Sequence, residues 1–185
     1  SATLRGIDGC QVTVEIHVSN GLPSYTVVGL PDASCRESRD RVRAAVLSCD
    51  HPWPSTRITV NLAPTGVPKA GAGLDLAIAV GILAAGGVVP PAALEGMAFL
   101  GELGLDGAVR PVLGAVPLVG ALGAVTTVVA AANAAHAALV AEGEVRAVSH
   151  LNEVVAALKG EAPWPDLPVS VAAPEPRVPP ADLAD

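Results

Sequence analysis

The sequence is poor in aromatic residues and in methionine. Aromatic side chains make up 2% of its 185 residues, and Tyr25, Phe99 and Met97 are each the only residue of their type. The core must therefore be built from small aliphatic side chains. A chain of this length buries roughly 70% of its unfolded surface as one domain, so we expect a stable fold without a disulfide or a metal.

Positive charge is also scarce. The 11 lysines and arginines face 18 acidic residues, which gives a formal net charge of −7. This excludes the broadly basic surface of an autonomous nucleic-acid-binding domain, so contact with nucleic acid would need a local patch. The three cysteines, Cys10, Cys35 and Cys49, lack C-x-x-C spacing, and we expect reduced structural thiols in a cytoplasmic protein.

The sequence has no strongly apolar run long enough for a membrane helix. Residues 111–141 carry no Asp, Glu, Lys or Arg, but the stretch is rich in small residues and interrupted by glycine and proline. It predicts a buried helix–strand–helix, and no membrane partner is expected. The chain starts at Ser1 with no features of a signal peptide, so we expect the front part of a longer bacterial protein.

The hydrophobic pattern predicts strands alternating with helices. Strands are expected at 11–18, 25–29, 57–63, 97–103, 126–131 and 145–148. Helices are expected from Pro31-Asp32 to Cys49, and at 74–84, 113–122, 134–140 and 151–159. Ser34 and Glu37 match a capping box at the start of the first helix.

This alternation indicates an α/β or α+β domain over residues 1–159, with helices packed on one sheet. Residues 160–185 contain seven prolines. Proline at this density does not build a core, so we expect a Pro-rich linker that leads to a further module.

The loop over residues 64–73 joins a predicted strand to a predicted helix, where backbone amides can bind an anion. It has no GxxxxGK[ST] motif, and Gly71-x-Gly73 lacks the third glycine of a dinucleotide site. Tight packing of the turn is the favoured interpretation. A phosphate- or nucleotide-binding enzyme domain that uses Gly71–Gly73 is the alternative. We expect Asp75, in the first turn of the next helix, to be a structural carboxylate that accepts hydrogen bonds from loop amides.

The only cluster of positive charge lies in residues 36–43. Two i,i+4 pairs neutralise half of it: Arg36 with Asp40, and Glu37 with Arg41. Arg39 and Arg43 remain free on one helix face. A solvated, salt-bridged face is one interpretation, and contact with a phosphate or a protein partner is the other.

Catalytic motifs are missing from the sequence. It contains no GxSxG elbow, no HExxH motif and no persuasive pair of carboxylates. We therefore expect no catalytic residue, no metal site and no bound cofactor in this chain.

A series of short segments is distinctive in combination. The series comprises Gly21-Leu-Pro23, Val28-Gly-Leu-Pro-Asp32, Glu37-Ser-Arg-Asp-Arg-Val-Arg-Ala-Ala45, Ile58-Thr-Val-Asn-Leu-Ala-Pro64, Pro68-Lys-x-Gly71 with Asp75, Phe99-Leu-Gly-Glu-Leu103 and Ser149-His-Leu-Asn-Glu-Val154. In this order the series resembles the N-terminal domain of the YifB/ComM-type Mg-chelatase-like AAA+ ATPases. The resemblance covers essentially the whole chain.

The resemblance implies a Lon-protease-like, ribosomal protein S5 domain 2-like fold. It also implies that an AAA+ module follows the linker, binds ATP and Mg²⁺ there, and assembles with other subunits, as a hexamer. Members of the family are implicated in DNA branch migration and helicase action during natural transformation and recombination.

Comparison with the Lon-type protease loop places its serine at Gly73 and its lysine at Val116. A Ser/Lys dyad needs a hydroxyl and an amine, and these residues offer neither. The resemblance thus implies a non-catalytic accessory domain that assists oligomer assembly or DNA engagement. Arg39, Arg43, Arg57 and Lys69 are its candidate contacts with DNA or a partner. A pure oligomerisation module is a further alternative.

Overall fold

The computed structural model describes residues 1–167. Strands from the first part of the chain form a three-stranded sheet in the order β3–β5–β4. β3 (Thr13–Ser19) runs antiparallel to β5 (Arg57–Ala63), and β4 (Ser24–Val28) runs parallel to β5. A hairpin of β1 (Ala2–Arg5) and β2 (Asp8–Gln11) precedes this sheet.

A second three-stranded sheet is parallel and has the order β10–β9–β6. Its strands are β6 (Met97–Leu100), β9 (Thr126–Ala130) and β10 (Val145–Val148). The short strands β7 (Glu102–Leu103) and β8 (Val109–Arg110) form a separate antiparallel pair.

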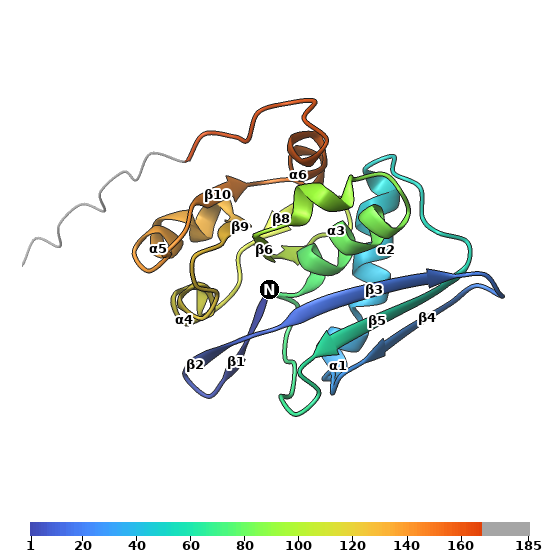
Figure 1. The fold of residues 1–185 in the computed structure, drawn as a ribbon, viewed down its shortest axis with the longest axis horizontal. Helices are drawn as coiled ribbons and strands as arrows, with labels where there is room; N and C mark the ends of the chain where they lie inside the picture. Colours follow the sequence, from blue (N-terminus) through green and yellow to red (C-terminus); the bar gives the residue numbers. More distant parts are fainter. Residues whose placement is uncertain (168–185) are drawn as a thin grey trace, which may run out of the picture.

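Helices separate and cover these sheets (Figure 1). They are α1 (Ala33–Arg36), α2 (Ser38–Ser48), α3 (Asp75–Ala85), α4 (Ala115–Gly120), α5 (Ala134–Ala138) and α6 (Leu151–Leu158), with short 3-10 turns at Pro91–Leu94 and Ala131–Asn133. The central helix α3 packs against β3, β6 and α2. Because it is enclosed in this way, most of its residues are buried.

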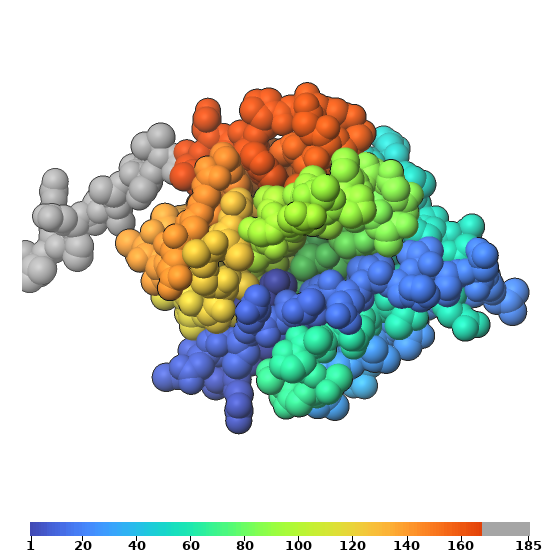
Figure 2. All heavy atoms as spheres, in the orientation of Figure 1, coloured from blue at the N-terminus to red at the C-terminus, as the bar shows by residue number. Residues whose placement is uncertain are grey.

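Two apolar clusters form the core, and both are built mainly from Ala, Val, Leu and Ile as the composition predicts. The larger cluster joins α2, α3, α6 and β5. The smaller one joins β1, α4 and α5 to the parallel sheet. Figure 2 shows the first half of the chain, in blue to green, lying side by side with the second half, in yellow to red.

The α+β class predicted from the sequence is confirmed, but the strands are divided among several sheets. The expected single sheet is interrupted because α3 inserts between β3 and β6. The strand over 57–63 has the predicted bounds. The stretch 111–141 forms α4, β9 and α5, as predicted. Within residues 1–167, no helix combines the length and the apolar character needed to cross a bilayer.

The first predicted helix is divided at Glu37 into α1 and α2, and the predicted capping box at Ser34 is wrong. Asp32 is the N-cap residue instead, because its Oδ1 accepts a hydrogen bond from the Cys35 amide at 2.7 Å. A capping box does occur at α6, between His150 and Glu153.

The chain passes from α6 into the proposed linker at Gly160, and the first linker residues lie against the domain. Trp164 is partly buried on the larger apolar cluster. The remainder of the predicted linker, residues 168–185, lies outside the described residues. All three cysteines are free, and burial raises the pKa of the Cys35 thiol to about 11, which keeps it protonated.

Candidate functional site

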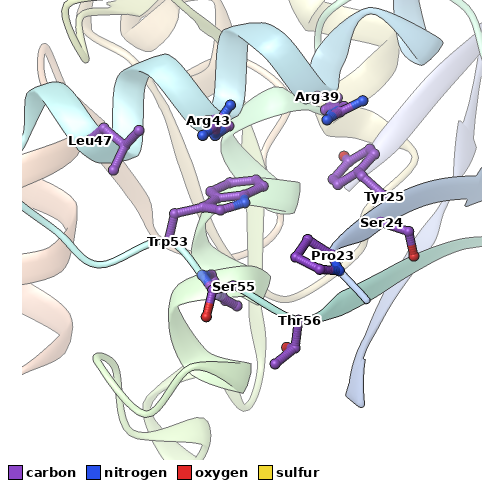
Figure 3. Close-up of a pocket in the computed structure, with 10 residues that line it drawn as sticks. Pro23, Ser24, Tyr25, Arg39, Arg43, Leu47, Trp53, Ser55 and Thr56 are labelled. Atoms are coloured by element: carbon purple, nitrogen blue, oxygen red, sulfur yellow. The ribbon is translucent and has the colours of Figure 1, made fainter. Parts of the chain in front are cut away.

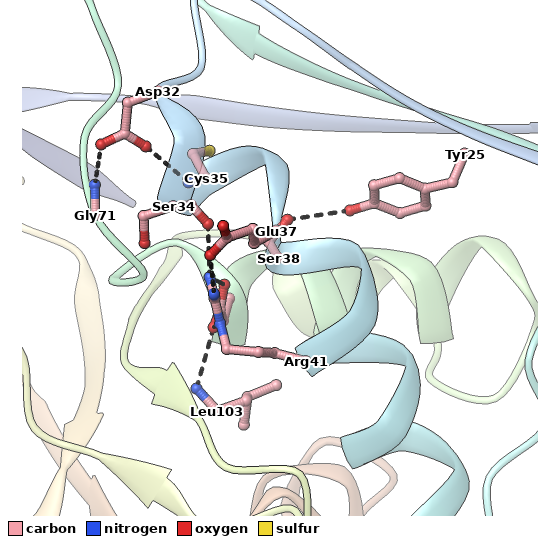
Figure 4. A network of polar contacts seen from close by, with 10 residues as sticks. Tyr25, Asp32, Ser34, Cys35, Glu37, Ser38, Arg41, Gly71 and Leu103 are labelled. Atoms are coloured by element: carbon pink, nitrogen blue, oxygen red, sulfur yellow. Dashed lines mark hydrogen bonds and ion pairs between the residues drawn. The ribbon is translucent and has the colours of Figure 1, made fainter.

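The segments that carry the family resemblance meet around α1 and the start of α2 (Figure 4). Asp32 links two of them, because its carboxylate caps α1 and also accepts a hydrogen bond from the Gly71 amide at 3.0 Å. The backbone adds two further links: the Asp32 amide donates to the Lys69 carbonyl at 2.9 Å, and the Lys69 amide donates to the Leu30 carbonyl at 3.0 Å. The loop over 64–73 is therefore fixed to the segment before α1.

A buried ion pair joins α2 to α3. Arg41 donates to Asp75 through Nε at 2.7 Å and through Nη2 at 3.1 Å, and its Nη2 also donates to the Ser34 carbonyl at 2.8 Å. The Asp75 side chain is 1% exposed. Burial raises the pKa of Asp75 to about 6, and the hydrogen bonds from Arg41 oppose this rise.

The predicted structural role of Asp75 is confirmed in part. It is buried and accepts a hydrogen bond from the Leu103 amide at 3.4 Å, but its main partner is a guanidinium. The predicted Glu37–Arg41 pair is present at a loose 3.9 Å. The predicted pair of Arg36 with Asp40 is not among the ion pairs within residues 1–167.

Lys69, one of the four candidate contacts, is fully buried. Its Nζ donates to the Pro64 carbonyl within the same loop. Because its backbone is hydrogen-bonded to residues 30 and 32, the side chain lies inside the molecule. The prediction that Lys69 forms part of an exposed contact surface is therefore wrong.

Gly73, which the family resemblance aligns with the Lon-type serine, lines a cavity of about 430 Å³. A Cβ atom on Gly73 would lie 3.2 Å from Cγ1 of Val112. Val116 is 40% exposed on α4 and is not among the lining residues. These are Ala2, Thr3, Leu4, Ser34, Ala70, Gly71, Ala72, Gly73, Glu102, Pro111, Val112, Leu113 and Leu118.

Two features of the loop before α3 disfavour a phosphate there. The amide of Ala70 donates to Thr3 Oγ1 at 3.2 Å, and the amide of Gly71 is used by Asp32. Glu102 adds a carboxylate to the cavity lining. Because the Ala70 and Gly71 amides are already in use and Glu102 adds negative charge, these features favour tight turn packing over the phosphate-binding alternative.

The free cations of α2 lie beside a groove of about 370 Å³, here called the aromatic–arginine groove (Figure 3). Its lining residues are Pro23, Ser24, Tyr25, Arg39, Arg43, Leu47, Trp53, Pro54, Ser55 and Thr56. The rings of Tyr25 and Trp53 stack with centroids 6.2 Å apart and an angle of 27° between their planes. Arg39 and Arg43 are exposed and have no ion-pair partner among residues 1–167.

The structure thus brings together two of the four candidate contacts. Arg57 is also exposed, but it is not among the residues that line the groove. Its guanidinium lies near Gly21 instead. Sequence reasoning assigned no role in a site to Tyr25 or Trp53. Their proximity depends on the parallel pairing of β4 with β5, which local patterns do not report. The rarity of aromatic residues is the one sequence feature that could have drawn attention to Tyr25 and Trp53.

Tyr25 supplies a test of the groove, because it is the only tyrosine in the sequence. Burial raises the pKa of Tyr25 from 10.0 to about 12. Burial of the neutral Tyr25 phenol contributes fully to stability below the pKa that Tyr25 has in the unfolded chain. This contribution is lost as the pH rises through the higher pKa that Tyr25 has in the folded protein. We expect the ultraviolet absorbance of the phenolate to appear near pH 12 in the folded protein. A transition near pH 10.0 under native conditions would show that the ring is solvated.

These features define an α+β domain in which residues of the shared motifs, such as Asp32, Arg41 and Asp75, hydrogen-bond to other parts of the same domain. The comparisons with known proteins then give the family. The profile described as "Subunit ChlI of Mg-chelatase" matches residues 14–143, and the chain belongs to this Mg-chelatase-like family. The resemblance noted from the sequence is confirmed.

Relatives from three bacterial species align along most of the chain. A protein of Mycobacterium tuberculosis is 45% identical over 163 residues, which are 86% of this chain and 32% of that protein. YifB of Salmonella typhimurium is 41% identical over 160 residues, with corresponding shares of 84% and 31%. The competence protein ComM of Haemophilus influenzae is 40% identical over 169 residues, with shares of 89% and 33%. The chain spans about a third of the length of these relatives.

Proposed function

We propose that this chain is a non-catalytic accessory domain of an Mg-chelatase-like AAA+ ATPase of the ComM type, which acts in DNA branch migration. The domain assists subunit assembly, DNA engagement or both. The AAA+ module that binds ATP and Mg²⁺ follows it in the longer protein, which works in the cytoplasm. Similarity to ComM and YifB over most of the chain supports this placement.

The observation that carries the proposal is the aromatic–arginine groove. Arg39 and Arg43 lie one helical turn apart on the exposed face of α2, where their charges are available to phosphates. Trp53 and Tyr25 lie beside them, partly buried and with their rings stacked on each other. Cations next to aromatic rings are the combination that engages single strands of nucleic acid. This contact with nucleic acid would require neither a protease dyad nor a phosphate-binding loop.

Charge reversal tests this contact in the full-length protein. We expect Arg39→Glu with Arg43→Glu to weaken binding of forked DNA by at least about tenfold at low salt, because two phosphate contacts become repulsive. The salt dependence of the remaining binding should also fall. Fluorescence anisotropy gives the affinity, and sedimentation reports the oligomer in the same samples.

Arg36→Glu is the matched control, because Arg36 is exposed on α1 but does not line the groove. Its effect on DNA binding should be several times smaller. If the double variant retains both DNA binding and oligomer formation, the groove has no part in either activity and the proposed contact is wrong.

A further inference from the structure

The cavity beside Gly73 has a free strand edge along one side. Ala2, Thr3 and Leu4 of β1 line this cavity of about 430 Å³, whereas no residue of β2 does. The cavity therefore lies on the side of β1 that faces away from β2, between the hairpin and the loop that leads into α3 (Figure 1). We call it the β1 cleft. Within residues 1–167, β2 is the only strand that pairs with β1.

The hydrogen-bonding pattern of the hairpin identifies the backbone groups at this edge. The Val12 amide donates to the Ser1 carbonyl at 2.8 Å, one position beyond the paired strands. Residues of an antiparallel pair alternate between bonding to the partner strand and pointing away from it. Thr3 therefore bonds to β2, whereas the amide and carbonyl groups of Ala2 and Leu4 point away from β2, toward the cleft. An edge of this kind can pair with a further strand.

The two faces of β1 meet the two walls of the cleft, because successive side chains of a strand point to opposite faces. Leu4 lies against α4 and the segment before it: a Cβ atom on Gly114 would lie 2.9 Å from Leu4 Cδ1. Thr3 points the other way, and its hydroxyl accepts a hydrogen bond from the Ala70 amide at 3.2 Å. The β1 cleft thus opens between an α4 wall and a wall formed by the loop before α3.

The walls differ in chemistry. The α4 wall is apolar, and its Leu113 is 91% exposed. Glu102 is the only charged residue in the lining, and its carboxylate forms no ion pair within residues 1–167. It follows Gly101, whose amide donates to the Gly73 carbonyl at 3.1 Å, so Glu102 belongs to the wall opposite α4. The cleft therefore offers an apolar surface on one side and a single negative charge on the other.

We propose that the β1 cleft binds an extended segment of a partner protein as an additional β-strand. The backbone of the segment pairs with Ala2 and Leu4. Its side chains alternate, apolar toward the α4 wall and small toward the opposite wall, where one lysine or arginine pairs with Glu102. This function goes beyond the proposed contact with DNA, because the β1 cleft and the aromatic–arginine groove share no lining residue.

Fluorescence anisotropy with the 185-residue chain tests the binding. The probe is a fluorescein-labelled heptapeptide with leucine at its odd positions, lysine at its centre and serine at the other two. Replacing the lysine by glutamate should weaken binding about fivefold, because a favourable charge pair becomes repulsive. N-methyl groups on alternate amides should weaken binding by about tenfold in one of the two possible sets, because only the set that faces β1 donates to its carbonyls.

Variants of the two walls assign the binding to the cleft. We expect Leu113→Ser to weaken peptide binding by about threefold or more through lost apolar contact. Leu139→Ser is the matched control, since Leu139 is 77% exposed and does not line the cleft. Glu102→Gln should remove the preference for lysine over glutamate, whereas the exposed Glu95→Gln should keep it. A preference unchanged in Glu102→Gln would overturn the assigned charge pair.

Amide hydrogen exchange followed by nuclear magnetic resonance reports the strand pairing directly. Peptide binding should slow the exchange of the Leu4 amide by at least about tenfold, because this amide gains a partner. The Thr3 amide, which already bonds to β2, should change little. Binding without slower exchange at Leu4, or equal losses with both sets of N-methyl groups, would overturn the pairing.

The remaining outcomes are equally decisive. Absence of peptide binding at about 1 mM would overturn the proposal. If Leu4 exchange slows as the chain alone is concentrated, a second copy occupies the cleft and the proposal of a separate partner fails. Arg39→Glu with Arg43→Glu should leave peptide binding unchanged, so that the peptide site and the proposed DNA contact succeed or fail separately.

Discussion

Replacing Arg41 by methionine is expected to destabilise the domain by about 3–5 kcal/mol, because it leaves the carboxylate of Asp75 buried without its partner. The Asp75 side chain is 1% exposed, and Arg41 supplies two of its hydrogen bonds. The substitution also removes the bond to the Ser34 carbonyl. Urea unfolding followed by circular dichroism gives the free energy of unfolding.

A double-mutant cycle with Asp75→Asn isolates the pair. The combined variant should be more stable than the sum of the single effects predicts, because neither side chain then carries an unpaired buried charge. Glu37→Gln is the control: Glu37 is 74% exposed and 3.9 Å from Arg41, so its loss should change stability by less than about 0.5 kcal/mol. Equal effects of Arg41→Met and Glu37→Gln would contradict the assigned pairing.

Replacing Gly29 by alanine is expected to cost at least about 3 kcal/mol. Gly29 has φ +100°, and a Cβ atom would lie 2.1 Å from the Leu62 carbonyl oxygen. This contact is with backbone at the end of the β4–β5 pair, so it cannot be relieved by moving a side chain. The same urea unfolding measures the loss, which should appear as a lower midpoint with little change in slope.

Gly66→Ala is the control for this substitution. No atom lies within 4 Å of the position of its Cβ, and Gly66 belongs to an exposed turn. Its effect should stay within about 0.5 kcal/mol. Equal free energies of unfolding for Gly29→Ala and Gly66→Ala would contradict the close contact between Gly29 and the Leu62 carbonyl.

The sequence allowed most elements to be predicted, because their hydrophobic periodicity is local. The strand over 57–63 alternates buried and less buried residues, and its predicted bounds match β5. The β1–β2 hairpin was missed, since its strands are four residues long and pack through Gly9 against Pro117, more than a hundred positions away. Division into several sheets likewise follows from the insertion of α3, which no local pattern encodes.

The site was less predictable than the fold. Helical spacing assigns Glu37 to Arg41, but Asp75, 34 positions away, is the stronger partner because it is buried. Lys69 was predicted to be an exposed cation, but the backbone hydrogen bonds of Lys69 to residues 30 and 32 position its side chain inside the domain. Arg39 and Arg43 stayed on one exposed face as predicted, since that face follows from helix geometry alone.

The two sides of helix α2 lie in different environments. One side is anchored through Arg41 to α3, the most enclosed element of the fold, while the other side presents Arg39 and Arg43 to the outside. The Arg41–Asp75 pair therefore links the groove side of α2 directly to the centre of the domain. If the proposed contact at the groove holds, a DNA strand or a neighbouring subunit that pulls on α2 would pull on α3 as well, and through it on the larger apolar cluster.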